Sequence, residues 1–131
     1  MTKKPNSILL VDDDLDYSEL TRTRLEAHGY EVTHAANGRE ALSVLEREGD
    51  PGLIIMDLEM PDKNGLTALI NMKVRKITKD SPGDGHIPVI VATGLQSERI
   101  EEVVRKQSVD GYLKKPYDAE TLLREVKRLI G

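Results

Sequence analysis

The sequence contains no cysteine, no phenylalanine and no tryptophan, and only four of its 131 residues are tyrosine. Without cysteine the chain cannot form a disulfide, a thiol nucleophile or a thiolate metal site, which is compatible with a reducing cytoplasm. Oxygen atoms are therefore the abundant metal ligands that remain. Because aromatic side chains are so scarce, we expect a core packed from leucine, isoleucine, valine, methionine and alanine.

Long apolar runs and an excess of positive charge are also absent. No run approaches the roughly 20 residues of a transmembrane helix, and residues 1–7 lack the apolar region of a signal peptide. The formal net charge of -4 gives no general electrostatic reason to bind nucleic acid or an anionic membrane. We therefore expect a cytoplasmic module that contacts neither, with a flexible tail at residues 1–7 and one domain at residues 8–131.

The sequence does contain a repeated alternation of strand and helix signals. Apolar runs predict strands near residues 8–11, 30–35, 53–57, 88–92 and 111–115. Apolar positions at helical spacing follow each run, for example Leu122, Val126 and Leu129 in the last segment. This alternation predicts an α/β fold with a single doubly wound, five-stranded parallel sheet and five helices on its two faces.

Local signals refine the expected boundaries. Asp16 with Glu19 resembles a capping box at the start of the first helix, and Asn37 with Glu40 has the same spacing before the second. The segment Thr78–Ile87, with the sequence TKDSPGDGHI, interrupts the alternation and predicts a surface loop.

Polar residues follow several of the predicted strands. The central run ends in Asp57 and continues into a loop that bears Pro61 and Gly65. The other strand ends carry Asp12 and Asp13, Thr93 and Gly94, and Lys115 and Pro116. The carboxyl ends of parallel strands meet at one edge of a sheet, so we expect a common site there. A single aspartate after a strand is also typical of an ordinary turn, so the prediction depends on the whole set.

In this order and at these strand ends, the set closely resembles the receiver domain of two-component response regulators, over about residues 8–130. The resemblance implies the flavodoxin-like strand order 2-1-3-4-5, which chemotaxis receivers illustrate. It also implies a phosphoacceptor that takes a phosphoryl group from a sensor histidine kinase or a phosphotransfer protein. Such a module catalyses its own phosphorylation and slow dephosphorylation and has no separate substrate to turn over.

The implied strand order makes the first and third strands neighbours, which brings Asp12, Asp13 and Asp57 together. Three carboxylates this close raise one another's pKa unless a cation compensates them, and Mg²⁺ suits a site of a few carboxylates, waters and phosphate oxygens. The resemblance implies direct Mg²⁺ ligation by Asp13 and Asp57, partly water-mediated ligation by Asp12, and ligation by the backbone carbonyl of Glu59. Three solvated surface acids are the alternative.

The resemblance also assigns roles around Asp57, the expected nucleophile. Lys115 would supply positive charge to the phosphoryl group. Alternation along the strand would turn Lys114 to the opposite side, where it would be an ordinary exposed lysine. Pro116 stands where the family has a cis peptide bond that directs this lysine.

A conformational switch is implied by three further residues. Thr93, followed by Gly94, would bond a phosphoryl oxygen, and Tyr112 would swing into the space that Thr93 vacates. The readout face would then be the fourth helix, the fifth strand and the fifth helix. That face would contact an effector protein or an output domain, or form a homodimer.

Glu59 departs from the common receiver pattern, and we expect its acidic side chain to alter the lifetime of the phosphoryl group. A pseudo-receiver, which keeps the fold but is switched by docking, is the main alternative function; the complete set of polar residues argues against it. A phosphatase of the haloacid dehalogenase type would need a second aspartate where Glu59 stands. A nucleotide-binding Rossmann domain would need a glycine-rich loop after the first strand, and the sequence has none.

Overall fold

The computed structural model describes residues 4–57, 87–94 and 110–131. Its strands are β1 (Lys4–Val11), β2 (Glu31–Ala35), β3 (Pro51–Asp57), β4 (Val89–Thr93) and β5 (Gly111–Lys114). Its helices are α1 (Leu15–Glu26), α2 (Gly38–Glu48) and α5 (Ala119–Ile130). The two helices expected on either side of β4 lie outside the described residues, as does the expected loop up to residue 86. Within the described ranges, no helix is long and apolar enough to cross a membrane.

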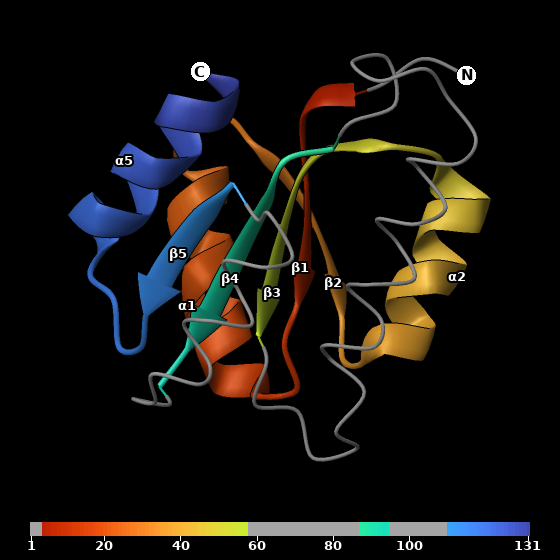
Figure 1. Cartoon of the computed structure of the whole chain (residues 1–131), viewed down its shortest axis with the longest axis horizontal. Helices are drawn as coiled ribbons and strands as arrows, with labels where there is room; N and C mark the ends of the chain where they lie inside the picture. Colours follow the sequence, from red (N-terminus) through yellow and green to blue (C-terminus); the bar gives the residue numbers. More distant parts are fainter. Residues whose placement is uncertain (1–3, 58–86, 95–109) are drawn as a thin grey trace.

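The five strands form one sheet in the order β2-β1-β3-β4-β5, with every neighbouring pair parallel (Figure 1). The expected order is confirmed. β3 lies at the centre of the sheet and all of its residues are buried, which explains why its sequence is a continuous apolar run. Asp57 is the last residue of this strand, so the most deeply buried element of the sheet fixes its position.

Each face of the sheet carries its own apolar cluster, because successive side chains along a strand point to opposite faces. The cluster shared with α1 and α5 includes Ile8, Leu10, Leu53, Ile55, Leu113, Leu25, Leu122 and Val126. The cluster shared with α2 includes Leu9, Val11, Ile54, Met56, Val91, Ala41 and Val44. Helices α1 and α5 therefore cover one face and α2 covers the other, as Figure 1 shows.

β1 begins at Lys4 and not at Ile8, so the expectation of a flexible tail over residues 1–7 is wrong for residues 4–7. The backbone of Lys4 pairs with Pro51, and that of Ser7 pairs with Glu31. The register on the β3 side is irregular between Lys4 and Ile8. Backbone pairing needs no apolar side chain, which is why this polar stretch carried no strand signal.

Asp14 caps α1, because its carboxylate accepts a hydrogen bond of 3.0 Å from the backbone N–H of Tyr17. The prediction that Asp16 caps this helix is wrong, since Asp16 lies inside its first turn. For α2 the predicted cap is confirmed: the Asn37 side chain accepts a hydrogen bond of 2.9 Å from the backbone N–H of Glu40. Each cap ends a loop that leaves the carboxyl edge of the sheet, so the caps fix where these loops run.

Candidate functional site

Two neighbouring strands bring acidic side chains to the carboxyl edge of the sheet. Val11 of β1 pairs with Met56 of β3, so Asp12 and Asp57 emerge side by side. Both are buried, with 2% and 3% of their surface exposed, whereas Asp13 is more exposed. One carboxylate oxygen from each of the three lies within 4.8 Å of the others. The predicted convergence of the three carboxylates is confirmed.

Lys115, which directly follows the outer strand β5, reaches the same carboxylates. Its ammonium nitrogen donates to Oδ2 of Asp12 at 2.8 Å and to Oδ2 of Asp57 at 3.1 Å. Leu113, two residues earlier, packs in the α1 and α5 cluster, and alternation carries Lys115 to the same side while Lys114 is exposed. The expected distinction between the two lysines is confirmed, and the Lys115–Pro116 peptide bond is cis as expected.

The charges at this edge do not balance within the cluster, because three carboxylates face one ammonium group. Burial alone would lower the pKa of Lys115, but its hydrogen bond to Asp12 and the negative charges of Asp12 and Asp57 outweigh burial and hold that pKa well above its ordinary value. Lys115 is therefore cationic at neutral pH. The oxygen ligands and the excess negative charge that remains are what a small divalent cation requires.

The backbone N–H, the backbone carbonyl and the carboxylate of Asp12 all form hydrogen bonds. Its N–H donates to the carbonyl of Ala35 at 3.0 Å, and its carboxylate also accepts from the N–H of Asp14 at 2.9 Å. The imidazole of His34 donates from Nε2 to the carbonyl of Asp12 at 2.7 Å. A carbonyl only accepts, so Nε2 must carry the hydrogen. These contacts fix the start of the loop that carries Asp13.

His34 and Tyr17 are contacts of the site that sequence reasoning did not find. His34 lies near the end of β2, opposite Leu10, so the strand order together with the parallel register could have placed it beside the acidic loop. Tyr17 lies in the first turn of α1, with the Lys115 nitrogen 4.6 Å from the centre of its ring. Only its place directly after the acidic loop could have drawn attention to it.

The other residues predicted for the site lie on β4, on β5 or outside the described residues. Thr93 is the last residue of β4 and its backbone pairs with Lys114, while Gly94 follows it and is half-buried. Tyr112 is half-buried and packs against the α2 cluster. Glu59, Pro61 and Gly65 lie outside the described residues. Their roles, and those of Thr93 and Tyr112, stay predictions.

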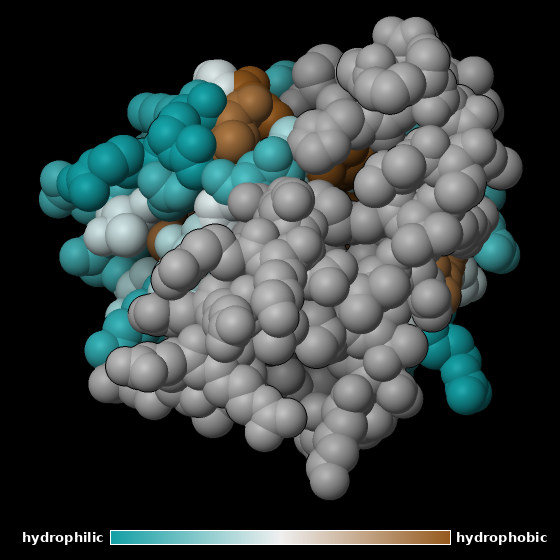
Figure 2. Space-filling view, viewed as in Figure 1, coloured by the Kyte–Doolittle hydropathy of each residue, from teal (hydrophilic) through white to brown (hydrophobic). Residues whose placement is uncertain are grey.

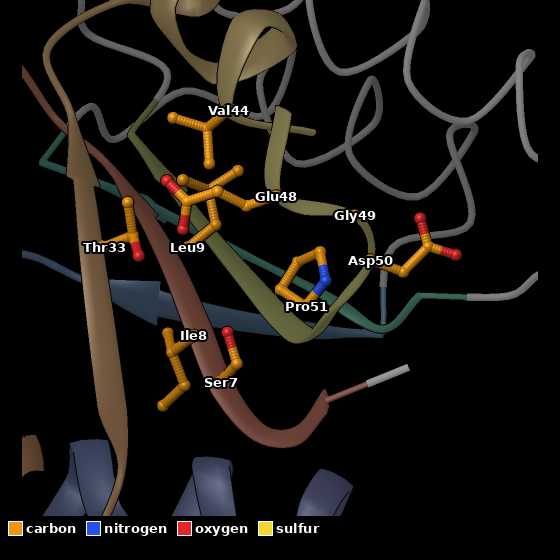
Figure 3. Close-up of a pocket in the computed structure, with 9 residues that line it drawn as sticks. All are labelled: Ser7, Ile8, Leu9, Thr33, Val44, Glu48, Gly49, Asp50 and Pro51. Carbon is orange, nitrogen blue, oxygen red and sulfur yellow. The ribbon is translucent and has the colours of Figure 1, made fainter. Parts of the chain in front are cut away.

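A small cavity lies away from this edge, beside the middle of β1 and the start of β3 (Figure 3). It is lined by nine residues that include Ser7, Glu48 and Pro51. Its volume of about 20 Å³ suits a single water molecule. Because of its size and its distance from the acidic edge, this cavity is no candidate for a substrate pocket.

Comparisons with known proteins agree with this geometry. Residues 8–127 match the family model described as a response regulator receiver domain. The chain is 35% identical over 127 residues to the polar-differentiation response regulator DivK of Brucella anthropi, covering 97% of this chain and 98% of that protein. For DivK of Brucella ovis the identity is 35% over 131 residues, with 100% and 98% covered.

Solved structures give the same result. A CheY-like receiver domain protein from Methanospirillum hungatei is similar with a TM-score of 0.79 and 32% identity, covering 93% of this chain and 90% of that one. The signal receiver domain of a histidine kinase from Syntrophus aciditrophicus has a TM-score of 0.80 and 33% identity, covering 95% and 89%. These similarities extend over nearly the whole chain and include the sheet that carries the acidic site.

Proposed function

The chain belongs to the response regulator receiver domain family, and on this premise we propose that Asp57 is the phosphoacceptor of a two-component signalling module. The observation that carries the proposal is the ammonium group of Lys115, which joins the buried carboxylates of Asp12 and Asp57 at the carboxyl edge of the sheet. The three clustered carboxylates supply a nucleophile and metal ligands, and Lys115, bonded to two of them, supplies positive charge for a phosphoryl group. Phosphoryl transfer requires these three components.

Asp57 would act as the nucleophile. One of its carboxylate oxygens forms a bond to phosphorus while the bond from phosphorus to the donor breaks on the opposite side. With the phosphohistidine of a sensor kinase as donor, the electron pair of the breaking P–N bond stays on the imidazole, which takes up a proton. The products are an acyl phosphate on Asp57 and a free histidine on the kinase.

The donor set at this edge fits Mg²⁺, because the oxygens of Asp12, Asp13 and Asp57 lie within 4.8 Å of one another. We assign Asp13 and Asp57 as direct ligands, Asp12 as a ligand partly through water, and the carbonyl of Glu59 as the fourth contribution. Bound Mg²⁺ would neutralise charge on the transferring phosphoryl oxygens.

Lys115 would complete the charge compensation from the other side. Its ammonium group has three N–H donors, and the bonds to Asp12 and Asp57 use two of them. The third is available to a phosphoryl oxygen on Asp57. Because the ammonium group already lies at the site, no large movement is needed to bring it there.

Phosphorylation would be read out through Thr93, Gly94 and Tyr112. We assign Thr93 a hydrogen bond to the phosphoryl oxygen and Tyr112 an inward movement that shifts the protein between two populated packings. β5 and α5, with the helix expected before them, would form the readout face. Figure 2 shows mainly hydrophilic residues over α5, with a hydrophobic patch beside its C-terminal end.

The phosphoryl donor would be a sensor histidine kinase or a phosphotransfer protein, and the location would be the cytoplasm, where such donors receive phosphate from ATP. The similar proteins occur in two settings: DivK is named as a response regulator, and the Syntrophus receiver belongs to a histidine kinase. An effector protein, an output domain or a second copy of the chain would receive the signal.

Glu59 would set the lifetime of the acyl phosphate, which the dephosphorylation rates of Glu59→Ala and Glu59→Lys would reveal.

The alternative function is a pseudo-receiver that works by docking alone. The buried carboxylates of Asp12 and Asp57, each paired with Lys115, disfavour it, because burying charged groups has a cost that a docking module does not require. Incubation with acetyl phosphate and Mg²⁺, followed by intact mass measurement, separates the two. A phosphate adduct that disappears in Asp57→Asn supports the phosphoacceptor, and the absence of any adduct in the wild-type chain would favour the pseudo-receiver.

A further inference from the structure

Tyr17 faces the cation of the phosphoryl site. The Lys115 nitrogen lies 4.6 Å from the centre of the Tyr17 ring, within the roughly 6 Å at which a cation interacts favourably with an aromatic face. The Lys115 side chain is only 13% exposed, so this interaction takes place where water screens it little. The ammonium group of Lys115 therefore interacts with the Tyr17 ring in addition to the carboxylates of Asp12 and Asp57.

Tyr17 is itself held at its backbone and at its hydroxyl group. Its backbone N–H donates to the Asp14 carboxylate at 3.0 Å, which ties it to the acidic loop. Its hydroxyl oxygen accepts from the N–H of Tyr117 at 2.9 Å, which ties it to the segment that follows Lys115. The rings of Tyr17 and Tyr117 meet edge to face, with centres 5.2 Å apart and an angle of 81°.

Tyr117 is itself fixed by burial and by hydrogen bonds to α1. It is 6% exposed, and its hydroxyl shares a hydrogen bond of 3.2 Å with that of Thr21 in α1. The carbonyl of Tyr117 also accepts from Arg24 at 3.5 Å. Tyr17 is thus a fixed part of the contact between α1 and the segment before α5, and its position relative to Lys115 follows from that contact.

An aromatic face suits this role because it attracts a cation without accepting a directed hydrogen bond from it. A carboxylate at the same place would accept a directed hydrogen bond from Lys115 and so compete with a phosphoryl oxygen, whereas the ring accepts none. The ring also compensates part of the cost of removing the ammonium group from water.

From these contacts we propose that Tyr17 is a positioning residue that holds the Lys115 ammonium group over its ring, ready for the phosphoryl group on Asp57. The role in phosphorylation rests on the function proposed above. The contact itself does not, since it joins two side chains of the unphosphorylated protein.

The first test uses nuclear magnetic resonance on the metal-free, unphosphorylated chain. The ring should shift the Lys115 Hε protons upfield and show a nuclear Overhauser effect to them. The upfield shift should persist in Tyr17→Phe and vanish in Tyr17→Leu. Lys115 protons at ordinary positions in the wild-type chain, with no Overhauser effect, would overturn the proposal whether or not the variants fold.

The second test measures phosphorylation by acetyl phosphate with Mg²⁺. Tyr17→Leu should slow it by about tenfold, and Tyr17→Phe by about threefold or less, because the phenyl ring remains. Progressive fluorination of the ring in Tyr17→Phe keeps its shape and removes its negative face, so the rate should fall with each fluorine. A merely structural role predicts one rate for the whole fluorinated series, and that result would overturn the proposal.

Tyr30→Leu is the matched control, because Tyr30 is a buried tyrosine in the same cluster as α1 and α5. It should lower stability yet leave the Lys115 resonances and the phosphorylation rate near their wild-type values. A rate loss in Tyr30→Leu equal to that of Tyr17→Leu would contradict the proposal. If the wild-type chain accepts no phosphate at all, the proposed function fails, and the resonance measurements still decide whether Tyr17 holds Lys115.

Discussion

The ammonium nitrogen of Lys115 lies 3.1 Å from Oδ2 of Asp57, although 58 residues separate the two in sequence. Strand order accounts for this meeting. β3 is the central strand and β5 is one of the two outer strands, and because all strands are parallel their carboxyl ends lie at the same edge of the sheet. The same ammonium group binds Asp12 at 2.8 Å, so one cation joins the ends of β1, β3 and β5. The stability and the chemistry of this edge should both depend on it.

Replacing Lys115 with methionine should lower the free energy of unfolding without Mg²⁺ by about 1–3 kcal/mol, because two buried carboxylates lose their cation. Mg²⁺ should then stabilise the variant more than the wild-type chain, since the metal replaces the missing charge. Urea denaturation with and without Mg²⁺ measures both effects. Lys114→Met, at an exposed position, should change the free energy by less than about 0.5 kcal/mol, and equal losses in the two variants would contradict the assignment.

Asp13→Asn should have the opposite effect on stability. Removing one carboxylate from a cluster with excess negative charge should raise the free energy of unfolding without Mg²⁺ by about 0.5–1 kcal/mol. The same change removes a metal ligand, so Mg²⁺ affinity, measured by calorimetry, should fall by at least about tenfold. Asp16→Asn is the control, because Asp16 is an exposed acid in the first turn of α1. Unchanged Mg²⁺ affinity in Asp13→Asn would exclude Asp13 as a ligand.

Tyr117 should make stability depend on alkaline pH. Burial raises the pKa of Tyr117 to about 12, from 10.0 for the free side chain, although the hydrogen bond with Thr21 opposes the shift. The unfolded chain therefore loses this proton at lower pH than the folded chain. The stabilisation is complete below pH 10 and is lost as the pH rises towards 12. Between these values the free energy of unfolding should fall more steeply in the wild-type chain than in Tyr117→Phe, by up to about 1.4 kcal/mol per pH unit. Parallel curves for the two proteins would show that Tyr117 titrates normally.

His34 should matter for metal binding without touching the metal. His34→Ala removes the donor to the Asp12 carbonyl and should weaken Mg²⁺ binding by about threefold to tenfold, because the acidic loop loses a fixed point. His34→Gln places an amide donor near the same position and should recover part of the affinity. His28→Ala is the matched control, since His28 is exposed in the turn that follows α1. If calorimetry gives the same Mg²⁺ affinity for His34→Ala and His28→Ala, His34 has no positioning role.

Sequence reasoning predicted the centre of the fold well. The run Leu53–Met56 is apolar at every position because β3 is buried on both faces, so its pattern is unambiguous and places Asp57 at its end. Alternation along β5 separated Lys114 from Lys115 for the same geometric reason. Strand order came from the family resemblance, since periodicity alone does not say which strands are neighbours.

Features that depend on backbone pairing or on contacts between distant segments were not predictable in this way. The first residues of β1 are polar, and their backbone pairs with Pro51 and Glu31 without any side-chain pattern. Asp14 and Asp16 are both chemically suited to cap a helix, and only the path of the loop decides between them. Tyr17 reaches Lys115 because α1 lies beside the segment before α5, which no local sequence pattern encodes.

The most direct test of the central claim is to locate the phosphoryl group. After incubation with acetyl phosphate and Mg²⁺, borohydride reduces an aspartyl phosphate to homoserine, and tandem mass spectrometry of the peptides then identifies the residue. The account predicts homoserine at position 57 alone, and none in Asp57→Asn. Homoserine at position 12 or 13 would contradict it. So would a phosphate adduct on the wild-type chain with no homoserine at position 57.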